Sequence, residues 1–405
     1  MIPSSTPLSE RPSVQRLISL DAFRGFTIAG MIVVNNPGSW SHVYTPLLHA
    51  DWHGITLTDF VFPFFLYIVG VSIALAYTKR LKTDAPRGGL YRKILIRSIK
   101  IFVVGLFLWL FPDFNFAALR IPGVLQRIAI VFLICALLFL NTNWKQQAYI
   151  AAAIVIGYWL MMVIIPVPID EVIREALASG QVMRSSGPVS IGPIHQISDA
   201  WIAPNLEPGT NLQAWLDRAV FPGRLWERTW DPEGLLSTLP AIATGIFGML
   251  AGSLIVSDKS QESKIIWLFS LGFAGFLLGS AWHWFFPINK NLWSSSFVLY
   301  TAGIASMTLA ASLFFVDMLG QKNWTRMGVI FGANAITAYV ISGILPDLFY
   351  APWFGGESMN SLFFKTLTGA GIAPKPVSLI YAIMYTLICY IPVYFLFRKK
   401  IFIKL

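Results

Sequence analysis

Residues 57–79 read LTDFVFPFFLYIVGVSIALAYTK, and this stretch decides the fold class. Residues 60–78 contain no charged side chain, so they form an apolar run as long as a helix needs to cross ~30 Å of hydrocarbon. An open strand in lipid would leave its backbone groups unpaired. We therefore predict a membrane-spanning helix here.

Similar apolar runs fill most of the chain. Hydrophobic residues make up 56% of the 405 residues and charged residues only 12%, against about 25% charged residues in an ordinary soluble domain. We predict an all-α, polytopic membrane bundle of about ten transmembrane helices, forming a single domain over residues 1–405. The predicted spans are 17–36, 57–79, 94–112, 121–140, 146–165, 234–256, 263–286, 294–318, 325–346 and 376–397.

The net charge of +10 arises largely from basic residues next to apolar spans, notably in 79–100 and 398–404. That arrangement indicates topology bias, so no nucleic-acid partner is expected, and the bias predicts cytoplasmic N- and C-termini. The opposite face then carries two long periplasmic loops, at about 167–233 and 347–375. Loops of this length usually have a role, and a substrate-facing lid and an inert cap are both open interpretations.

The loop between the first two spans gathers titratable groups. Residues 35–60, NNPGSWSHVYTPLLHADWHGITLTDF, hold His42, His49 and His53 together with Asp59. A histidine beside a carboxylate can act as a general base or as an acyl-accepting nucleophile. Interfacial anchoring is the simpler alternative. The spacings match no metal motif, so no metal is expected.

Arg24 and Arg127 lie within predicted spans, where charge is costly and often functional. Asp21 and Arg24 are three residues apart, which allows a structural ion pair or leaves Arg24 to face an anionic ligand. Arg127 lies a turn or two inside the fourth span. It either extends to the interface or helps to bind a substrate.

Polar residues also mark two junctions on the outer face. Asp231 and Glu233 precede the sixth span, where they either cap the helix or bind substrate. Asn289, Lys290 and Asn291 precede the eighth span and are candidates for binding sugar hydroxyls. The chain contains no phosphate-binding loop and no HExxH or CxxC motif. From the residues alone, a transporter or flippase for a sugar or lipid-linked sugar remains the alternative to an enzyme.

The chain resembles the heparan-alpha-glucosaminide N-acetyltransferase family and its bacterial relatives. The matching segments follow the family's order and are scattered over most of the chain. They are RLISLDAFRGFTIAGMIVVNN (16–36), LLHADWHGITLTDFVFPFFLYIVGVSIAL (47–75), IPGVLQRIA (121–129), WDPEGLLSTLPAIATGIFGMLAG (230–252), INKNLWSSSFVLYTAGIAS (288–306) and GANAITAYV (332–340).

The resemblance implies a transmembrane acetyltransferase, which moves acetyl from cytoplasmic acetyl-CoA to the amine of an amino sugar at the periplasmic side. It implies that His49 is the active-site histidine and that Asn35 belongs to the site. We expect Asp59 to orient or polarise a partner. Direct transfer to the amine is favoured, and an acetyl-histidine intermediate stays open. The expected contacts of the CoA phosphates are Arg24, Arg92, Lys93 and Arg97.

The start of the chain, close to the family's first conserved span, favours a bacterial member. The expected location is therefore the inner membrane, where the chain is multi-pass and the lipid bilayer is its surroundings. The expected acceptor is a glucosamine-type sugar or a cell-wall fragment. The family also leads us to expect a homodimer.

Overall fold

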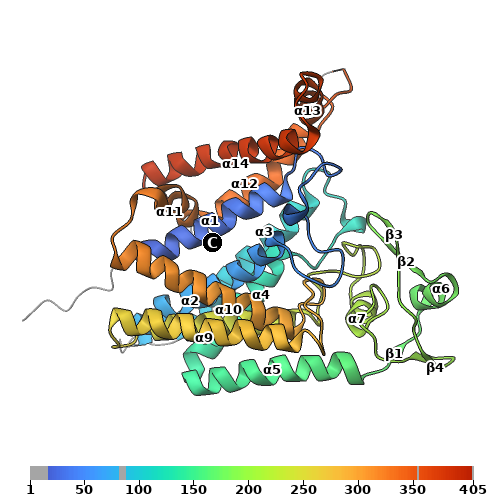
Figure 1. The fold of residues 1–405 in the computed structure, drawn as a ribbon, viewed down its shortest axis with the longest axis horizontal. Coiled ribbons are helices and arrows are strands. Elements are labelled where there is room, and N and C mark those ends of the chain that lie inside the picture. Colours follow the sequence, from blue (N-terminus) through green and yellow to red (C-terminus); the bar gives the residue numbers. More distant parts are fainter. Residues whose placement is uncertain (1–16, 82–87, 354, 404–405) are drawn as a thin grey trace, which may run out of the picture.

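The computed structural model describes residues 17–81, 88–353 and 355–403. The N-terminal segment and the basic residues predicted at 82–87 lie outside these ranges. The described chain forms one helical bundle with a smaller lobe at one end, on the right in Figure 1. The bundle confirms the prediction of a largely helical membrane protein.

Within the described ranges, eight helical segments are long and apolar enough to cross a membrane, or nine if a bent pair is one span. They fall on eight of the predicted spans. They are α1 (Ile18–Asn35), α2 (Val61–Leu81, preceded by the 3₁₀ turn η2, Leu57–Phe60), α4 (Val124–Asn141), α5 (Trp144–Ile164), α8 (Thr238–Ile255), α9 (Gln261–Trp282), α10 (Ser295–Ser312, continued by the π-helical η4, Leu313–Met318) and α14 (Pro374–Arg398).

The third and ninth predicted spans differ from this pattern. α3 (Gly88–Leu110) has the length of a span but carries Arg92, Lys93, Arg97 and Lys100. The ninth is broken between α11 (Arg326–Ala333) and α12 (Ala335–Phe349), which meet at 73°. Asn334 at the break donates its side-chain N–H to Ile401 O and accepts from Ile403 N, so side-chain bonds replace lost helical ones. The count of ten spans remains a prediction.

Close packing of α2 against α8 sets the geometry of the bundle end that adjoins the lobe of residues 167–233, which is called the outer end below. A Cβ added at Gly248 would lie 2.0 Å from Tyr67 O, and one added at Gly70 would lie 2.0 Å from Gly245 O. Only glycine at these positions lets the two backbones approach so closely. The approach brings η2, at the outer end of α2, near the segment that leads into α8.

The predicted loop 167–233 contains regular structure that the pattern did not predict. It forms the lobe in Figure 1 and adds short strands to an otherwise helical chain. β5 lies between β1 and β4 in one antiparallel sheet, and β2 pairs with β3 in another. The elements are β1 (Val167–Pro168), α6 (Glu171–Ser179), β2 (Gln181–Arg184), β3 (Gly187–Ser190), β4 (Gln196–Ser198), β5 (Trp201–Ile202) and α7 (Leu212–Val220).

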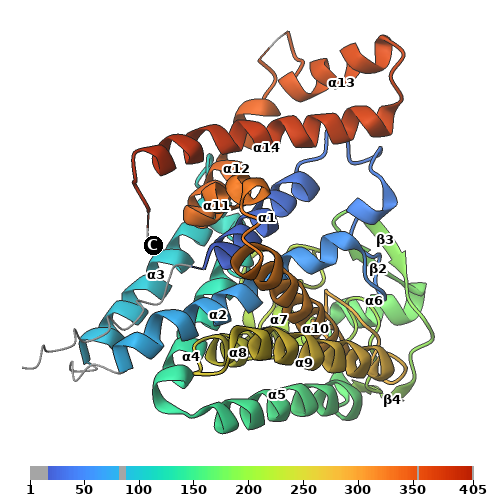
Figure 2. The ribbon, with the colours of Figure 1, turned by 60° about the vertical axis from the view of Figure 1, so that its left-hand side comes forward.

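A small core ties this lobe to the bundle. Val167, Ile173 and Ile202 are fully buried together with Tyr158 of α5. The Tyr158 hydroxyl donates to Leu292 O over 2.5 Å, on the segment before α10. The second predicted loop, 347–375, contains the helix α13 (Met359–Gly369), which lies alongside α14 in Figure 2. The remaining turns are η1 (Thr45–Leu47), η3 (Phe116–Ala118) and η5 (Asn323–Thr325).

Candidate active site

Asp59 is fixed by the backbone around η2. Its side chain is 1% exposed, and Oδ2 accepts the backbone N–H of Ala50 (3.1 Å) and of Thr56 (2.9 Å). Thr56 and Asp59 form a reciprocal capping box, which explains why the turn before α2 has this sequence. The other carboxylate oxygen, Oδ1, lies 2.6 Å from Nδ1 of His49. Asp59 thereby holds the imidazole in one orientation.

Lys290 approaches His49 from a distant part of the chain. Its Nζ lies 3.1 Å from Nε2 of His49 and 3.3 Å from Nδ1. Because Nδ1 donates its proton to the Asp59 carboxylate, Nε2 is the ring nitrogen that keeps a lone pair. His49 is 45% exposed, so this nitrogen is accessible to a substrate. The structure therefore brings together His49, Asp59 and Lys290, three of the predicted site residues.

The electrostatics favour a neutral His49. Partial burial and the Lys290 ammonium lower the pKa of His49, against the opposing effect of Asp59 and Glu233. An unprotonated imidazole is the form that can accept a proton. The arrangement suits a general base, or a nucleophile, at neutral pH.

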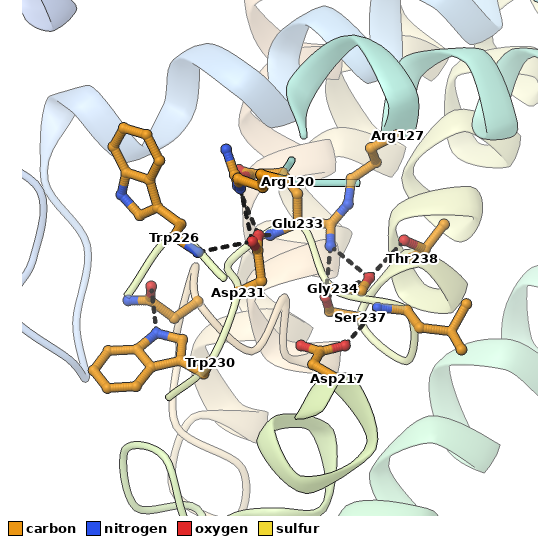
Figure 3. A network of polar contacts seen from close by, with 12 residues as sticks. Arg120, Arg127, Asp217, Trp226, Trp230, Asp231, Glu233, Gly234, Ser237 and Thr238 are labelled. Atoms are coloured by element: carbon orange, nitrogen blue, oxygen red, sulfur yellow. Dashed lines mark hydrogen bonds and ion pairs between the residues drawn. The ribbon is translucent and has the colours of Figure 1, made fainter. Parts of the chain in front are cut away.

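A buried ion network lies beside this group. Arg120 donates Nε to Asp231 Oδ2 (2.7 Å) and Nη2 to Asp231 Oδ1 (2.6 Å), and Nη2 also donates to Glu233 (2.5 Å). The three side chains are 8%, 0% and 10% exposed. Figure 3 shows both carboxylates directed at Arg120. Neither carboxylate caps α8, which begins at Thr238, so the capping interpretation was wrong.

The sequence analysis did not select Arg120. Its guanidinium lies over the rings of Trp226 (4.9 Å) and Trp109 (5.7 Å), which shield the ion pairs from water. Burial acts against its charge, but Asp231 and Glu233 outweigh burial and raise the pKa of Arg120. Its position just before a span resembles many interfacial arginines. Only the fold shows that it faces inward.

Arg127 also faces inward. It is 1% exposed, and Nη2 donates to Gly234 O (3.1 Å) and to Ser237 Oγ (2.5 Å), while the guanidinium lies 5.1 Å from the Trp293 ring. The snorkelling interpretation was therefore wrong. Glu233 lies within the field of both arginines, and although burial alone would raise its pKa, Arg120, Arg127 and Lys290 lower it. Glu233 is thus held as an anion beside Lys290 and His49.

The two asparagines beside Lys290 serve the turn that carries it. Asn289 is fully buried, and its Oδ1 accepts the backbone N–H of Leu292 (2.9 Å). Its Nδ2 lies 3.3 Å from His53 Nδ1. Asn291 accepts from Trp230 Nε1 over 3.4 Å. In 289–291, only the Lys290 side chain extends to His49, and sugar binding by Asn289 and Asn291 remains a prediction.

Asp217, on α7, is a second residue that the sequence analysis did not select. Its Oδ1 accepts the backbone N–H of Leu235 (2.8 Å), whereas the buried Oδ2 has no hydrogen-bond partner in the described chain. Burial raises the pKa of Asp217 to about 7. Figure 3 shows this carboxylate below the network, where it fixes the lobe to the segment before α8.

The remaining predicted site residues lie apart from His49. Asn35 is the last residue of α1 and is exposed, and no hydrogen bond between described residues joins it to His49. Arg24 lies near the opposite end of α1, where it donates to Ser72 Oγ (3.0 Å), Gly332 O (3.2 Å) and Asp21 (3.4 Å). The structural pair with Asp21 is therefore present. Arg24 thus donates to three acceptors within the protein, and other basic residues lie toward the same end of the bundle.

The basic residues of α3 lie toward the same end. Arg92 and Lys93 are exposed, and Arg97 places its guanidinium 4.7 Å from the Phe132 ring. None of these three residues contacts the His49 group in the described chain. A role for them in binding CoA phosphates therefore stays a prediction.

A cavity of about 640 Å³ lies between α1, α2, α10 and η4. Phe23 and Trp324 line it toward the end where Arg24 lies, and Leu57 and Phe60, which flank Asp59, line it toward the outer end. Its walls are mainly apolar. The cavity therefore extends between the two groups of predicted site residues.

The described residues contain no group of three or more His, Cys, Asp or Glu side chains that could hold an ion. They do contain a hydrogen-bonded His–Asp pair, with Lys290 Nζ against the imidazole. Such a pair can remove a proton from a nucleophile or accept an acyl group.

The fold and the site together define a multi-pass helical membrane protein with a histidine–carboxylate centre at the outer end of its bundle. Residues 16–173, which include His49 and Asp59, match the family model described as heparan-alpha-glucosaminide N-acetyltransferase, catalytic. The chain is similar to the heparan-alpha-glucosaminide N-acetyltransferases of Homo sapiens (28% identity over 100% of this chain) and Mus musculus (27% over 98%). It spans 62% of the length of each. The family match thus covers residues 16–173, and the similarity to the two relatives extends over the rest of the chain.

Proposed function

We propose that this protein is a transmembrane acetyltransferase, which moves acetyl from cytoplasmic acetyl-CoA to the amine of an amino sugar on the opposite side of the membrane. The observation that carries the proposal is the 2.6 Å contact between His49 and Asp59 at the outer end of the bundle. The contact leaves Nε2 of His49 as the proton acceptor. The names of the human and mouse relatives point to the same reaction.

In the proposed reaction, the neutral amine of the acceptor attacks the thioester carbonyl and His49 takes the amine proton through Nε2. A general base of this kind contributes about 10²–10⁴-fold to the rate. Asp59 stabilises the imidazolium that forms. Proton transfer from that imidazolium to the departing sulfur then returns His49 to its starting state.

The proposal gives a different role to each of three charged residues, Asp231, Glu233 and Arg127. Arg120 and Trp226 N already occupy both Asp231 oxygens, so Asp231 holds the wall of the site. Glu233 remains an anion close to Lys290 and can attract a cationic amino sugar. Arg127 fixes Gly234 and Ser237 and thereby the position of Glu233.

The donor is proposed to enter from the basic side of the bundle. Arg24, Arg92, Lys93 and Arg97 are placed toward that end and can neutralise the phosphates of CoA. The 640 Å³ cavity supports a route between helices for the acyl-carrying arm, because its outer end adjoins Asp59. We also propose that Asn35, the last residue of α1, donates a hydrogen bond to the developing oxyanion. A bacterial inner-membrane location and a homodimer are further parts of this proposal that rest on the resemblance.

The test is an assay of the purified protein in lipid vesicles with acetyl-CoA and glucosamine. The expected products are free CoA and N-acetylglucosamine in equal amounts. Glucosamine trapped inside vesicles and acetyl-CoA supplied outside test whether transfer crosses the membrane. Flux of unmodified glucosamine without release of CoA would instead identify a transporter and would end the enzymatic proposal.

A further inference from the structure

Lys290 carries the same functional group as the proposed acceptor. Its Nζ is a primary amine, and it lies 3.1 Å from Nε2 of His49, where the proton-accepting nitrogen needs its nucleophile. The acceptor amine of an amino sugar must come to the same nitrogen. The structure thus places a protein amine beside the same imidazole, 3.1 Å from Nε2 and 3.3 Å from Nδ1.

The turn that carries Lys290 is rigid. Asn289 N donates to Ser294 Oγ (3.0 Å), and Asn289 Oδ1 accepts Leu292 N. Trp293, also on this turn, is 1% exposed and donates its Nε1 to Thr244 Oγ1 on α8 (3.1 Å). The backbone of Lys290 is therefore held in place while its four-carbon side chain can rotate. Such an amine can meet His49 repeatedly and can also withdraw when a substrate enters.

We propose that Lys290 is an internal acceptor, whose Nζ receives the acetyl group when no amino sugar occupies the site. The inference rests on the proposed function. The neutral amine attacks the thioester carbonyl of acetyl-CoA, a C–N bond forms and the C–S bond breaks. The amine proton passes to Nε2 of His49 and then to the sulfur, so the products are acetyl-Lys290 and free CoA.

The surroundings of Lys290 favour this reaction. Burial is the main effect that lowers the pKa of Lys290, which increases the neutral, nucleophilic fraction of the amine. Among the charged groups that face it, Arg127 acts in the same direction, and Glu233, Asp59 and Glu227 act against it. Lys365 on α13 provides a contrast, because it is 65% exposed and paired with Glu357.

Acetylation would change the site in a defined way. The amide is uncharged, so the cation next to His49 is lost, and its acetyl group occupies the space of the product. An amino sugar that displaces Nζ from Nε2 would protect Lys290. Self-acetylation therefore reports whether the acceptor position is empty while donor is bound.

The experiment incubates the full-length protein in lipid vesicles with labelled acetyl-CoA and no acceptor, and then maps the label by peptide mass spectrometry. We expect one acetyl group on Lys290 that resists hydroxylamine, since an amide resists this reagent and an acetyl-imidazole does not. Excess glucosamine should suppress it. His49→Ala should reduce it ~10²-fold, because the base is lost. Lys290→Arg should abolish it, and Lys365→Arg should leave it unchanged.

The outcomes separate the inference from the proposed function. If the protein acetylates glucosamine but Lys290 remains unmodified, the inference fails and the function stands. If neither glucosamine nor Lys290 is acetylated, both fail. Equal acetylation of Lys290 in the wild type and in His49→Ala would identify uncatalysed modification and would also overturn the inference. The wild-type protein alone gives the first two results, so they do not depend on the folding of a variant.

Discussion

The two charged groups at the outer end of the bundle lie side by side yet differ in how their charges are used. In the Arg120–Asp231–Glu233 network, every side chain is at most 10% exposed and the guanidinium is bonded to both carboxylates. In the His49–Asp59–Lys290 group, the imidazole is 45% exposed. Its Nε2 lies 3.1 Å from the Lys290 ammonium group.

This difference indicates that the Arg120 network stabilises the structure, whereas the His49 group can take part in chemistry. Charges that are paired and buried are costly to disturb. A histidine fixed on one side and open on the other keeps an exchangeable proton site. We call His49–Asp59–Lys290 the open group and Arg120–Asp231–Glu233 the closed network. The comparison predicts that changes in the open group reduce activity and that changes in the closed network reduce stability.

His49→Ala tests the open group most directly. Loss of the base should lower kcat by about 10²–10⁴-fold, with the unfolding temperature nearly unchanged. The assay is acetyl transfer from acetyl-CoA to glucosamine. His42→Ala is the matched control, since His42 lies in the same loop but contacts Ser39 and Phe364. Near-normal turnover by His49→Ala would remove the basis of the comparison.

Arg120→Met tests the closed network. The variant leaves Asp231 and Glu233 as buried carboxylates without their main partner, which typically costs about 3–5 kcal/mol of stability. The measurement is unfolding in detergent, followed by intrinsic tryptophan fluorescence. Arg120→Lys should lose less, because it keeps the charge but not the bidentate geometry. Wild-type stability in Arg120→Met would show that the network is not structural.

Asp59→Asn tests whether Asp59 orients the His49 imidazole or only packs against it. The Asn oxygen is needed by the N–H groups of Ala50 and Thr56, so the amide NH₂ would face His49. Nδ1 would then have to accept, and the proton would move to Nε2, where no base remains. The expected fall in kcat is on the order of 10²-fold. An unchanged rate would show that Asp59 does not set the tautomer.

Lys290→Met should shift the pH dependence of kcat/KM. Because Lys290 lowers the pKa of His49, its removal raises that pKa. Activity requires neutral His49 and falls as pH decreases through the pKa, so the acid limb should move to higher pH. Lys365→Met is the control for a lost surface lysine. A shift to lower pH would contradict the electrostatic role given to Lys290.

Asp217→Asn should have the smallest effect. Burial raises the folded-state pKa of Asp217 to about 7, so folding favours the protonated form. The associated stability is full below the ordinary carboxyl pKa and is lost as pH rises through about 7. The amide cannot ionise, so the variant should be more stable than the wild type at pH above 7 and similar at low pH. Unfolding temperatures measured across pH test this, and equal curves would contradict it.

Hydrophobic patterning predicted the bundle because a membrane span requires a long run of apolar residues, and that requirement is local in sequence. The break at Asn334 was not predictable in this way, since the bonds to Ile401 and Ile403 that stabilise it come from a distant segment. The same limit applies to the lobe. Strands of two to four residues, such as Val167–Pro168, leave too short a pattern to recognise.

The sequence by itself determined a multi-pass helical protein and a histidine-rich outer loop in which His49 and Asp59 are ten residues apart. Only the tertiary structure decided which charges act together. Lys290 meets His49 across 241 residues of chain, and Arg120 meets Asp231 across 111. Such pairs form because helix packing brings distant segments to one end of the bundle, and no local pattern records that packing.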